Sequence, residues 1–371
     1  MKILELTNYS AGICGVWTRV REESVRLAES GYEVRVFSSN LTKGNNEIAK
    51  SEENIGKVRI FRFPAKKLGG ESFMSWNFEQ ESINFSPDII IAHSYRHIHT
   101  RKALIVAEKL RKMGKKCKVF LVTHAPFDRS GSRSLPSRMA VWYYDKFIAP
   151  RYLKNFDKIV AITKWEIPFL LDLGIKMEKI SYIPNGIPEE FFKIKRKVKM
   201  ENKILFLGRV SPIKSIETVI LAIPLLKDKD VIFEIVGPAE KKYFLKLKEL
   251  IKNLEMGNRI VFSKPVYDVK EKIKKIDSAK IFVLPSKSEG MSQSLVEAMA
   301  RSKIVIASDI PASRDLIENA KTGFLFKFGN EKELARIINN IKDEKKIEEN
   351  AKESVEQFEW SNIIKKIESL F

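Results

Sequence analysis

The stretch I-F-V-L-P-S-K-S-E-G-M-S-Q-S-L-V-E-A-M-A, residues 281–300, joins an apolar run to an amphipathic run through a polar loop. Four apolar residues at 281–284, followed by a proline, are typical of a buried strand that ends there. Ser292 suits the N-cap of a helix that turns Leu295 and Val296 toward a core. A strand, a loop and a helix in this order predict part of a βαβ unit, and hence a parallel sheet covered by helices.

The same alternation of short β-branched runs and longer helical patterns continues along the whole chain. Strands are expected at residues 2–7, 33–37, 58–61, 88–92, 118–122, 158–162, 180–183, 203–207, 231–236, 259–262, 281–284 and 304–307. Such an alternation implies βαβ units with right-handed crossovers. No apolar run approaches the ~18 residues that span a bilayer. The first residues read as a strand and not as a signal peptide.

The pattern is interrupted near residues 185–203, which suggests a domain boundary. Asn185-Gly186 is a turn pair, and the polar, basic run at 193–203 has the composition of an exposed linker. The predicted fold class is α/β, with two doubly wound parallel-sheet domains. The predicted boundaries are 1–190 for the first domain, 191–355 for the second and 356–371 for an amphipathic C-terminal helix. Since parallel sheets bind ligands beyond the carboxyl ends of their strands, two facing domains would place a site in the cleft between them.

The composition limits the class of protein. The chain has 67 Lys and Arg against 47 Asp and Glu, a formal net charge of +20, and is 44% hydrophobic, which excludes a disordered polybasic tail. Nucleic acid, an anionic membrane surface and a phosphorylated ligand all remain open as partners for this charge. Two cysteines, Cys14 and Cys117, cannot form a disulfide framework or a cysteine-rich metal site. We therefore expect a cytoplasmic protein.

Two carboxylates flank the start of the helix predicted in the opening stretch. The first free amides of that helix would favour a phosphate group. Glu289 in the loop and Glu297 in the second turn could both accept hydrogen bonds from sugar hydroxyls of one ligand. Equally open is a simpler interpretation, an acid that complements the helix dipole and an exposed surface glutamate.

Two further loops follow predicted strands. In L-G-R-V-S-P-I-K at 207–214, Arg209 and Lys214 stand where a diphosphate needs charge neutralisation, although two solvated cations are the commoner explanation in so basic a chain. Gly12 and Gly15 would let backbone approach a phosphate or a sugar closely. They do not form G-x-G-x-x-G, so dinucleotide binding is only weakly supported and ordinary turn chemistry remains open.

The four histidines fall at the ends of two predicted strands. His93, His97 and His99 resemble a metal cluster, but no local carboxylate completes a ligand set, so we predict no metal site. His124 directly follows a strand and is the better candidate for a site residue. A hydrogen-bonded loop histidine is the alternative.

The segment 128–152 interleaves arginines with aromatic residues. Our preferred interpretation is that these aromatics pack inward. Contact with a membrane interface is the second interpretation, and binding of nucleic acid is a third.

Taken together, the motifs resemble those of the retaining GT-B glycosyltransferases of family 4, and the resemblance covers nearly the whole chain. The residues that carry it are E-G-M-S-Q-S-L-V-E (289–297, the E-x7-E motif), G-R-V-S-P-I-K (208–214, the G-R-x4-K motif), I-P-N-G-I (183–187) and the run 308–326. The resemblance implies two Rossmann-like domains that face each other across a cleft, with a C-terminal helix that crosses back to the first domain.

The resemblance also implies roles for single residues. Arg209 and Lys214 would hold the donor diphosphate and stabilise the leaving group, and His124 would line the reaction centre. Glu289 would act on the transferred sugar. The remaining donor-binding residues implied are Gly12, Gly15, Gly290, Met291, Ser292, Gln293 and Glu297. Ser215 departs from the family pattern, which has a glycine after the motif lysine.

The function implied is transfer of a hexose from a nucleotide-diphosphate sugar with retention at the anomeric carbon, without a metal or other cofactor. We expect a lipid-linked or cell-surface glycan precursor as acceptor, with the protein in the cytoplasm and in peripheral contact with the anionic cytosolic face of a membrane. A soluble sucrose- or starch-synthase type of transferase is the alternative. A non-enzymatic nucleic-acid-binding protein ranks below both, because the sequence contains no reader motif.

Overall fold

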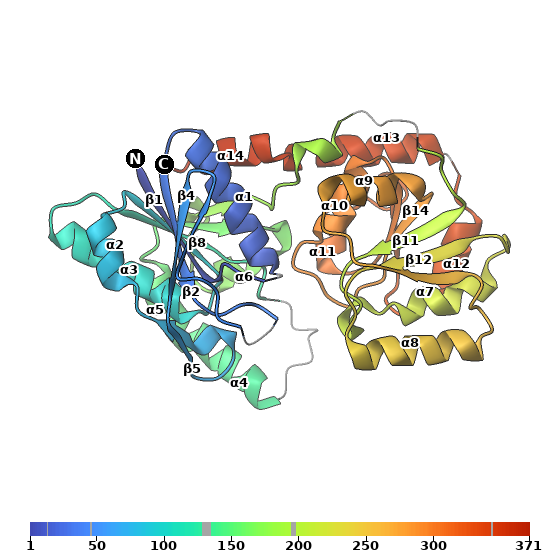
Figure 1. Cartoon of the computed structure of the whole chain (residues 1–371), viewed down its shortest axis with the longest axis horizontal. Helices are drawn as coiled ribbons and strands as arrows, with labels where there is room; N and C mark the ends of the chain where they lie inside the picture. Colours follow the sequence, from blue (N-terminus) through green and yellow to red (C-terminus); the bar gives the residue numbers. More distant parts are fainter. Residues whose placement is uncertain (13, 45–46, 128–134, 194–197, 343) are drawn as a thin grey trace. The chain divides into compact units, whose positions relative to one another are not determined.

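The computed structural model describes residues 1–12, 14–44, 47–127, 135–193, 198–342 and 344–371. Within them the chain forms two compact units, shown in Figure 1. The first unit comprises residues 1–127, 135–185 and 364–371, and the second comprises residues 186–363. Part of the basic-aromatic segment (128–134) and part of the linker expected at 193–203 (194–197) lie outside the described residues.

The first unit is built on an eight-stranded sheet. Its spatial order is β10-β9-β8-β7-β1-β2-β4-β3, and β3 runs antiparallel to β4 at one edge while the other neighbours pair in parallel. The strands are β1 (Lys2–Tyr9), β2 (Glu33–Ser39), β3 (Glu52–Ile55), β4 (Val58–Phe63), β7 (Ile89–His93), β8 (Lys118–Val122), β9 (Lys158–Ala161) and β10 (Ile180–Tyr182). The order of the strands along the chain reverses between β1 and β7, where doubly wound folds bind ligands.

Helices cover this sheet because each has one apolar face. In α1 (Gly15–Glu29), Trp17, Val20 and Leu27 are buried and recur at helical spacing. The other helices of the first unit are α2 (Glu79–Phe85), α3 (Ile98–Lys112), α4 (Leu135–Tyr143), α5 (Ala149–Leu153) and α6 (Ile167–Asp172). A two-stranded hairpin of β5 (Ala65–Lys67) and β6 (Met74–Trp76) adds the buried ring of Trp76 to the core.

The second unit has a six-stranded parallel sheet of order β13-β12-β11-β14-β15-β16. Its strands are β11 (Lys203–Leu207), β12 (Ile232–Val236), β13 (Ile260–Ser263), β14 (Ile281–Leu284), β15 (Ile304–Ser308) and β16 (Phe324–Phe326). The central strands β11, β14 and β15 are buried at every position, which explains their continuous apolar sequences. Here the strand order reverses between β11 and β14.

The helices of the second unit pack on that sheet. They are α7 (Glu217–Ala222), α8 (Lys241–Asn253), α9 (Val269–Ser278), α10 (Gln293–Ala300), α11 (Pro311–Arg314), α12 (Glu331–Asn339) and α13 (Glu344–Val355). The last helix, α14 (Trp360–Glu368), begins in the second unit, where Trp360 lies against Gly186, and continues into the first. In the first unit the terminal Phe371 ring contacts Tyr32 and Phe120.

The predicted fold class, two Rossmann-like α/β domains, is confirmed. Every predicted strand is present, three of them with the predicted bounds. The short strands β3, β5, β6 and β16 were missed. The facing of the two domains across a cleft stays a prediction. Among the described residues, no helix is both long enough and apolar enough to cross a bilayer.

Candidate functional site

In the second unit, two loops meet at the switch point of the sheet. They follow β11 and β14, which are neighbouring parallel strands, so both loops leave the same edge. The amide of Lys287 in one loop donates to the carbonyl oxygen of Ile213 in the other, at 2.8 Å. The G-R-x4-K and E-x7-E motifs, far apart in the sequence, therefore lie side by side.

Lys214 and Glu289 form an ion pair within these loops. Their side chains are 18% and 12% exposed, and the Ser286 hydroxyl donates to the same carboxylate oxygen at 2.6 Å. Lys214 ends a short 3-10 turn, and Ser215 after it has φ +49°, a left-handed conformation in which glycine is the least strained residue. Arg209, the other predicted cation, is exposed. The ammonium and the carboxylate thus neutralise each other.

Glu297 has a different surrounding from Glu289. It is 4% exposed in α10, and the Lys272 ammonium of α9 contacts its Oε1 atom at 2.5 Å. The interpretation of this residue as an exposed surface glutamate is therefore wrong. Each of the two predicted carboxylates is balanced by its own lysine.

Gly290, Met291 and Ser292 lead into α10, which begins at Gln293. Ser292 has the extended conformation of an N-cap, but its side chain makes no capping hydrogen bond and lies 3.4 Å from the Ser294 hydroxyl. Ser292 thus occupies the predicted N-cap position, but its side chain does not cap the helix. The start of this helix lacks a side-chain cap, although its amides are where the motif analysis expects a phosphate.

The two glycines after β1 differ in whether the fold leaves room for a side chain. Gly12 has φ +82°, and a Cβ atom there would lie 2.2 Å from the carbonyl oxygen of Lys43. Gly12 is therefore required by the fold of the first unit, whatever it binds. A Cβ atom at Gly15, the first residue of α1, would meet nothing within 4 Å.

His124 lies in the loop after β8 and is held in an unusual backbone conformation. It has φ +60° and the next residue, Ala125, has φ +50°. Ser94 and Arg96, after the neighbouring strand β7, also have positive φ, at +79° and +69°. Backbone strain of this kind persists only where the surrounding structure enforces it, and it clusters at functional sites.

Glu166 fixes the loop that carries His124. This carboxylate is fully buried and accepts five hydrogen bonds: from the Thr123 hydroxyl and the Ala125 amide on Oε1, and from the Ile162 amide, the Thr163 amide and the Thr163 hydroxyl on Oε2. Burial raises the pKa of Glu166, and the hydrogen bonds oppose that rise. The motif T-K-W-E (163–166) is a capping box and could have revealed this residue.

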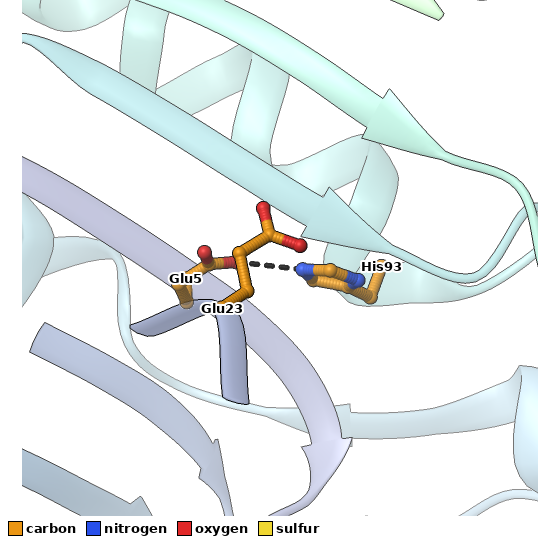
Figure 2. A group of neighbouring side chains, drawn as sticks. All are labelled: Glu5, Glu23 and His93. Carbon is orange, nitrogen blue, oxygen red and sulfur yellow. Dashed lines mark hydrogen bonds and ion pairs between the residues drawn. The ribbon is translucent and has the colours of Figure 1, made fainter. Parts of the chain in front are cut away.

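Behind His124 a chain of hydrogen bonds leads into the interior of the first unit. His124 Nε2 lies 2.9 Å from Nδ1 of His93, and Nε2 of His93 lies 2.6 Å from Oε2 of Glu5. Figure 2 shows Glu5, Glu23 and His93 together, with Glu5 and His93 joined by the dashed line. Glu23 pairs with Arg19 at 3.0 Å, and Arg19 also donates to the Asn185 side chain at 3.1 Å.

Burial is the largest influence on the pKa values of the hydrogen-bonded residues Glu5, His93 and His124 and of Glu23. It raises the pKa of Glu5 well above the ordinary carboxyl value and raises that of Glu23. It lowers the pKa of His93 to about 4 and moves the pKa of His124 well below the ordinary value. Both imidazoles are therefore neutral at neutral pH, and a carboxyl group is the place that holds a proton most readily.

Glu5, Glu23 and His93 are also a group of three metal-ligating side chains in the described part of the chain, with ligand atoms within 4.8 Å of one another. Oε2 of Glu5 and Nε2 of His93 already engage each other, and Oε2 of Glu23 is paired with the Arg19 guanidinium, which brings a positive charge into the group. The arrangement is therefore that of a hydrogen-bonded ion-pair cluster. Sequence reasoning missed Glu5, Arg19 and Glu23, because a charged residue inside an apolar strand or helix gives no local signal of its partner.

Comparison with known proteins connects both units to one group of enzymes. Residues 188–358 match the family "Glycosyl transferases group 1", and residues 13–191 match "Glycosyltransferase Family 4". An uncharacterized glycosyltransferase of Methanocaldococcus jannaschii is 28% identical over 98% of this chain and 96% of its own. The alpha-monoglucosyldiacylglycerol synthase of Streptococcus pneumoniae is 24% identical over 86% of this chain and 73% of its own.

The fold is also similar to that of a solved structure. The structure of Anabaena HepE in complex with UDP superposes with a TM-score of 0.75, covering 100% of this chain and 99% of that one at 19% identity. The two family matches lie end to end over the two units described above. The chain therefore belongs to the group 1 glycosyltransferases, enzymes of the GT-B fold that transfer a sugar from a nucleotide sugar.

Proposed function

We propose that this chain is a retaining, metal-independent hexosyltransferase that uses a nucleotide-diphosphate sugar and a lipid-linked or cell-surface glycan precursor as acceptor. The second unit binds the donor. Arg209 and Lys214 neutralise the diphosphate as it leaves, Glu289 and the amides of 290–293 hold the transferred sugar, and Glu297 binds the ribose. His124, Gly12 and Gly15 contribute from the first unit.

The observation that carries this proposal is the pairing of the two motif loops at the switch point between β11 and β14. A lysine, a carboxylate and the uncapped start of α10 converge there. A leaving diphosphate develops negative charge, which fixed cations and helix amides stabilise in the transition state. The carboxylate beside the lysine then suits the hydroxyls of the sugar.

Substitution of the two cations tests the assignment. Lys214→Ala and Arg209→Ala are each expected to lower kcat by about 10²–10⁴-fold, because each removes charge that acts on the transition state. The fold is expected to persist, because Lys214 is partly exposed and Arg209 is exposed. Lys321→Ala is the matched control, since that side chain is 60% exposed in the same unit. Near-normal transfer by both cation variants would refute the assignment.

The donor is identified by a thermal-shift screen over nucleotide sugars. A ligand that binds only the folded state raises the unfolding temperature with its concentration. A UDP-sugar is the first member to test, because the similar Anabaena HepE was solved with UDP. Stabilisation by nucleic acid, with none by any nucleotide sugar, would favour the nucleic-acid-binding alternative.

Retention and metal independence need their own measurements. The anomeric configuration of the product, read from its proton NMR coupling, distinguishes retention from inversion. Turnover in excess EDTA is expected to equal turnover without it, since Lys214 and Arg209 supply the positive charge. Loss of activity that Mg²⁺ restores would contradict metal independence.

Peripheral membrane contact is supported by a surface on α4 and the turn after it. Trp142 and Tyr143 are each 56% exposed and Phe147 is 40% exposed, so the preferred interpretation that the aromatics pack inward is wrong for these three. Tyr144 and Tyr152 pack against the core. The Lys146 ammonium lies 4.9 Å from the Trp142 ring centroid, which places a cation among exposed rings, as at a lipid headgroup layer.

Liposome flotation tests this contact. The wild-type chain is expected to float with anionic vesicles at low salt, and Trp142→Glu is expected to abolish flotation. Leu245→Glu is the matched control, since Leu245 has the same 56% exposure in the other unit. Absence of flotation for the wild type would leave a soluble sucrose- or starch-synthase type of enzyme as the better proposal. Flotation would be consistent with a cytoplasmic protein on the cytosolic face.

A further inference from the structure

The hydrogen-bonded chain Glu5–His93–His124 constrains the proton positions of all three groups. A neutral imidazole has one nitrogen that donates and one that accepts. If Glu5 is ionised, His93 must donate to it through Nε2, so its Nδ1 must accept from Nε2–H of His124. Nδ1 of His124 then carries a lone pair. If Glu5 is protonated at Oε2, the oxygen that faces His93, every bond reverses and Nδ1 of His124 carries a proton.

The hydrogen-bonded series Glu5–His93–His124 is held in place by burial and by further hydrogen bonds. The His93 side chain is 0% exposed, as is that of Glu5. The His93 carbonyl oxygen accepts from His99 at 2.8 Å. The loop that presents His124 is held by Glu166 in a strained conformation. Oε1 of Glu5 has no hydrogen-bond partner among the described residues, so a proton on it would have no acceptor, whereas a proton on Oε2 is accepted by Nε2 of His93.

We propose that Glu5 and His93 are positioning residues that set the tautomer of His124, so that its Nδ1 accepts a hydrogen bond from a sugar hydroxyl when Glu5 is ionised and donates one when Glu5 is protonated. This proposal rests on the function proposed above, in which His124 lines the reaction centre, and it adds that His124 contacts a hydroxyl of the sugar. It adds two residues of the first unit that no motif includes.

When the series Glu5–His93–His124 takes up a proton, each of its hydrogen bonds is kept and reverses direction. A proton added at Nδ1 of His124 releases the Nε2 proton of His124 to Nδ1 of His93, and the Nε2 proton of His93 passes to Oε2 of Glu5. The product is a neutral carboxylic acid and two neutral imidazoles of opposite tautomer. The raised pKa of Glu5 and the lowered pKa of both histidines agree with this end state, because each favours the proton on the carboxyl group.

Other charged groups face the chain from its neighbours. Arg19 and Glu23 of α1 lie beside Glu5 and His93, and His97, in the loop before α3, acts on His124. The Arg19 guanidinium favours ionised Glu5. Glu23 is paired with that guanidinium, and its own pKa is raised by the neighbouring charge of Glu5. The transition therefore belongs to the cluster, and it is assigned to Glu5 by substitution.

The test follows the imidazole nitrogens of the full chain, labelled with ¹⁵N-histidine, by NMR from about pH 5 to about pH 9. In the wild type, His124 is expected to be protonated at Nε2 alone at high pH and to gain a proton at Nδ1 as the pH falls. Protonation at Nδ1 throughout would overturn the proposal. This readout needs no variant and no turnover.

Glu5→Gln removes the proton acceptor and keeps the shape. The His124 transition, and the acid limb of kcat/KM, are expected to move down by about one pH unit or more, because the added proton no longer neutralises a carboxylate. Glu234→Gln, at a buried strand carboxylate of the second unit, is the control and should leave the transition unchanged. A Glu5→Gln transition identical to the wild type would refute the relay.

The two proposals fail separately. Wild-type turnover with an unchanged Glu5→Gln titration refutes the relay and leaves the transferase assignment intact. A titration as predicted, without turnover on any nucleotide sugar, supports the relay and refutes the proposed function.

Discussion

Replacement of Glu166 is expected to destabilise the first unit strongly. Glu166→Ala removes the acceptor of three backbone amides and two hydroxyls, all buried. The Thr123 hydroxyl keeps a second acceptor, the carbonyl oxygen of Val160 at 3.2 Å, so the amides dominate the cost. Each unsatisfied buried amide costs about 1–3 kcal/mol, and release of the buried carboxylate offsets part of the sum. The net loss is about 3–5 kcal/mol.

Urea unfolding followed by the fluorescence of the chain measures this loss, and the unfolding temperature of the first unit should fall by about 10 °C. The matched control is Glu178→Ala, because that side chain is 71% exposed and its ion pair with Lys176 spans 3.8 Å. It should change the free energy of unfolding by less than about 0.5 kcal/mol. A Glu166→Ala protein within about 1 kcal/mol of the wild type would show that the five hydrogen bonds do not hold the His124 loop.

Two further substitutions act on the second unit. Gly237→Ala would place a Cβ atom 1.9 Å from the carbonyl oxygen of Gly208, at a residue with φ +149°. The free energy of unfolding in urea should fall by about 2–4 kcal/mol, and kcat should fall because the loop that carries Arg209 moves. The control is Gly257→Ala, whose Cβ atom would meet nothing within 4 Å and which should change neither quantity. Glu234→Gln should lose about 2 kcal/mol at neutral pH after allowance for solvent screening, because ion pairs and hydrogen bonds with Lys203, Lys275 and Ser263 lower the pKa of Glu234 to about 2. Since this pKa is depressed, the contribution is present above about pH 4.5 and is lost as the pH falls toward 2, so the urea midpoints of variant and wild type should converge in acid. Midpoints that stay equally far apart from pH 7 to the acid limit would contradict it.

The sequence predicted the positions of the sheets well because their central strands are buried on both faces. β8, β11 and β14 have the predicted bounds, since each is an apolar run bounded by turn residues. The missed strands are only three or four residues long: β3 is E-E-N-I with three exposed residues, β5 and β6 form the hairpin, and β16 is the three-residue edge strand F-L-F. Pairing with a neighbour, which no local pattern encodes, makes them strands.

The candidate site likewise contains residues that the sequence predicted and residues that only the fold reveals. Motif resemblance predicts Arg209, Lys214 and Glu289 as site residues, which stays a prediction; the structure pairs Lys214 with Glu289, because their loops follow neighbouring strands of a parallel sheet. Glu5, His93 and His124 are linked by contacts between residues 31 and 88 positions apart in the chain. Periodicity assigns such residues to a core, and only the fold shows which polar atoms face each other there.

The ion pair between Lys214 and Glu289 has a consequence for selectivity among anions. Because Glu289 balances the charge of Lys214, we expect a small anion such as inorganic phosphate to gain little by approaching the lysine. A ligand that offers hydroxyls to the carboxylate as well as phosphate oxygens to the ammonium satisfies both partners at once. If the proposed function is correct, the pair would therefore favour molecules that carry a sugar and a diphosphate together over free phosphate.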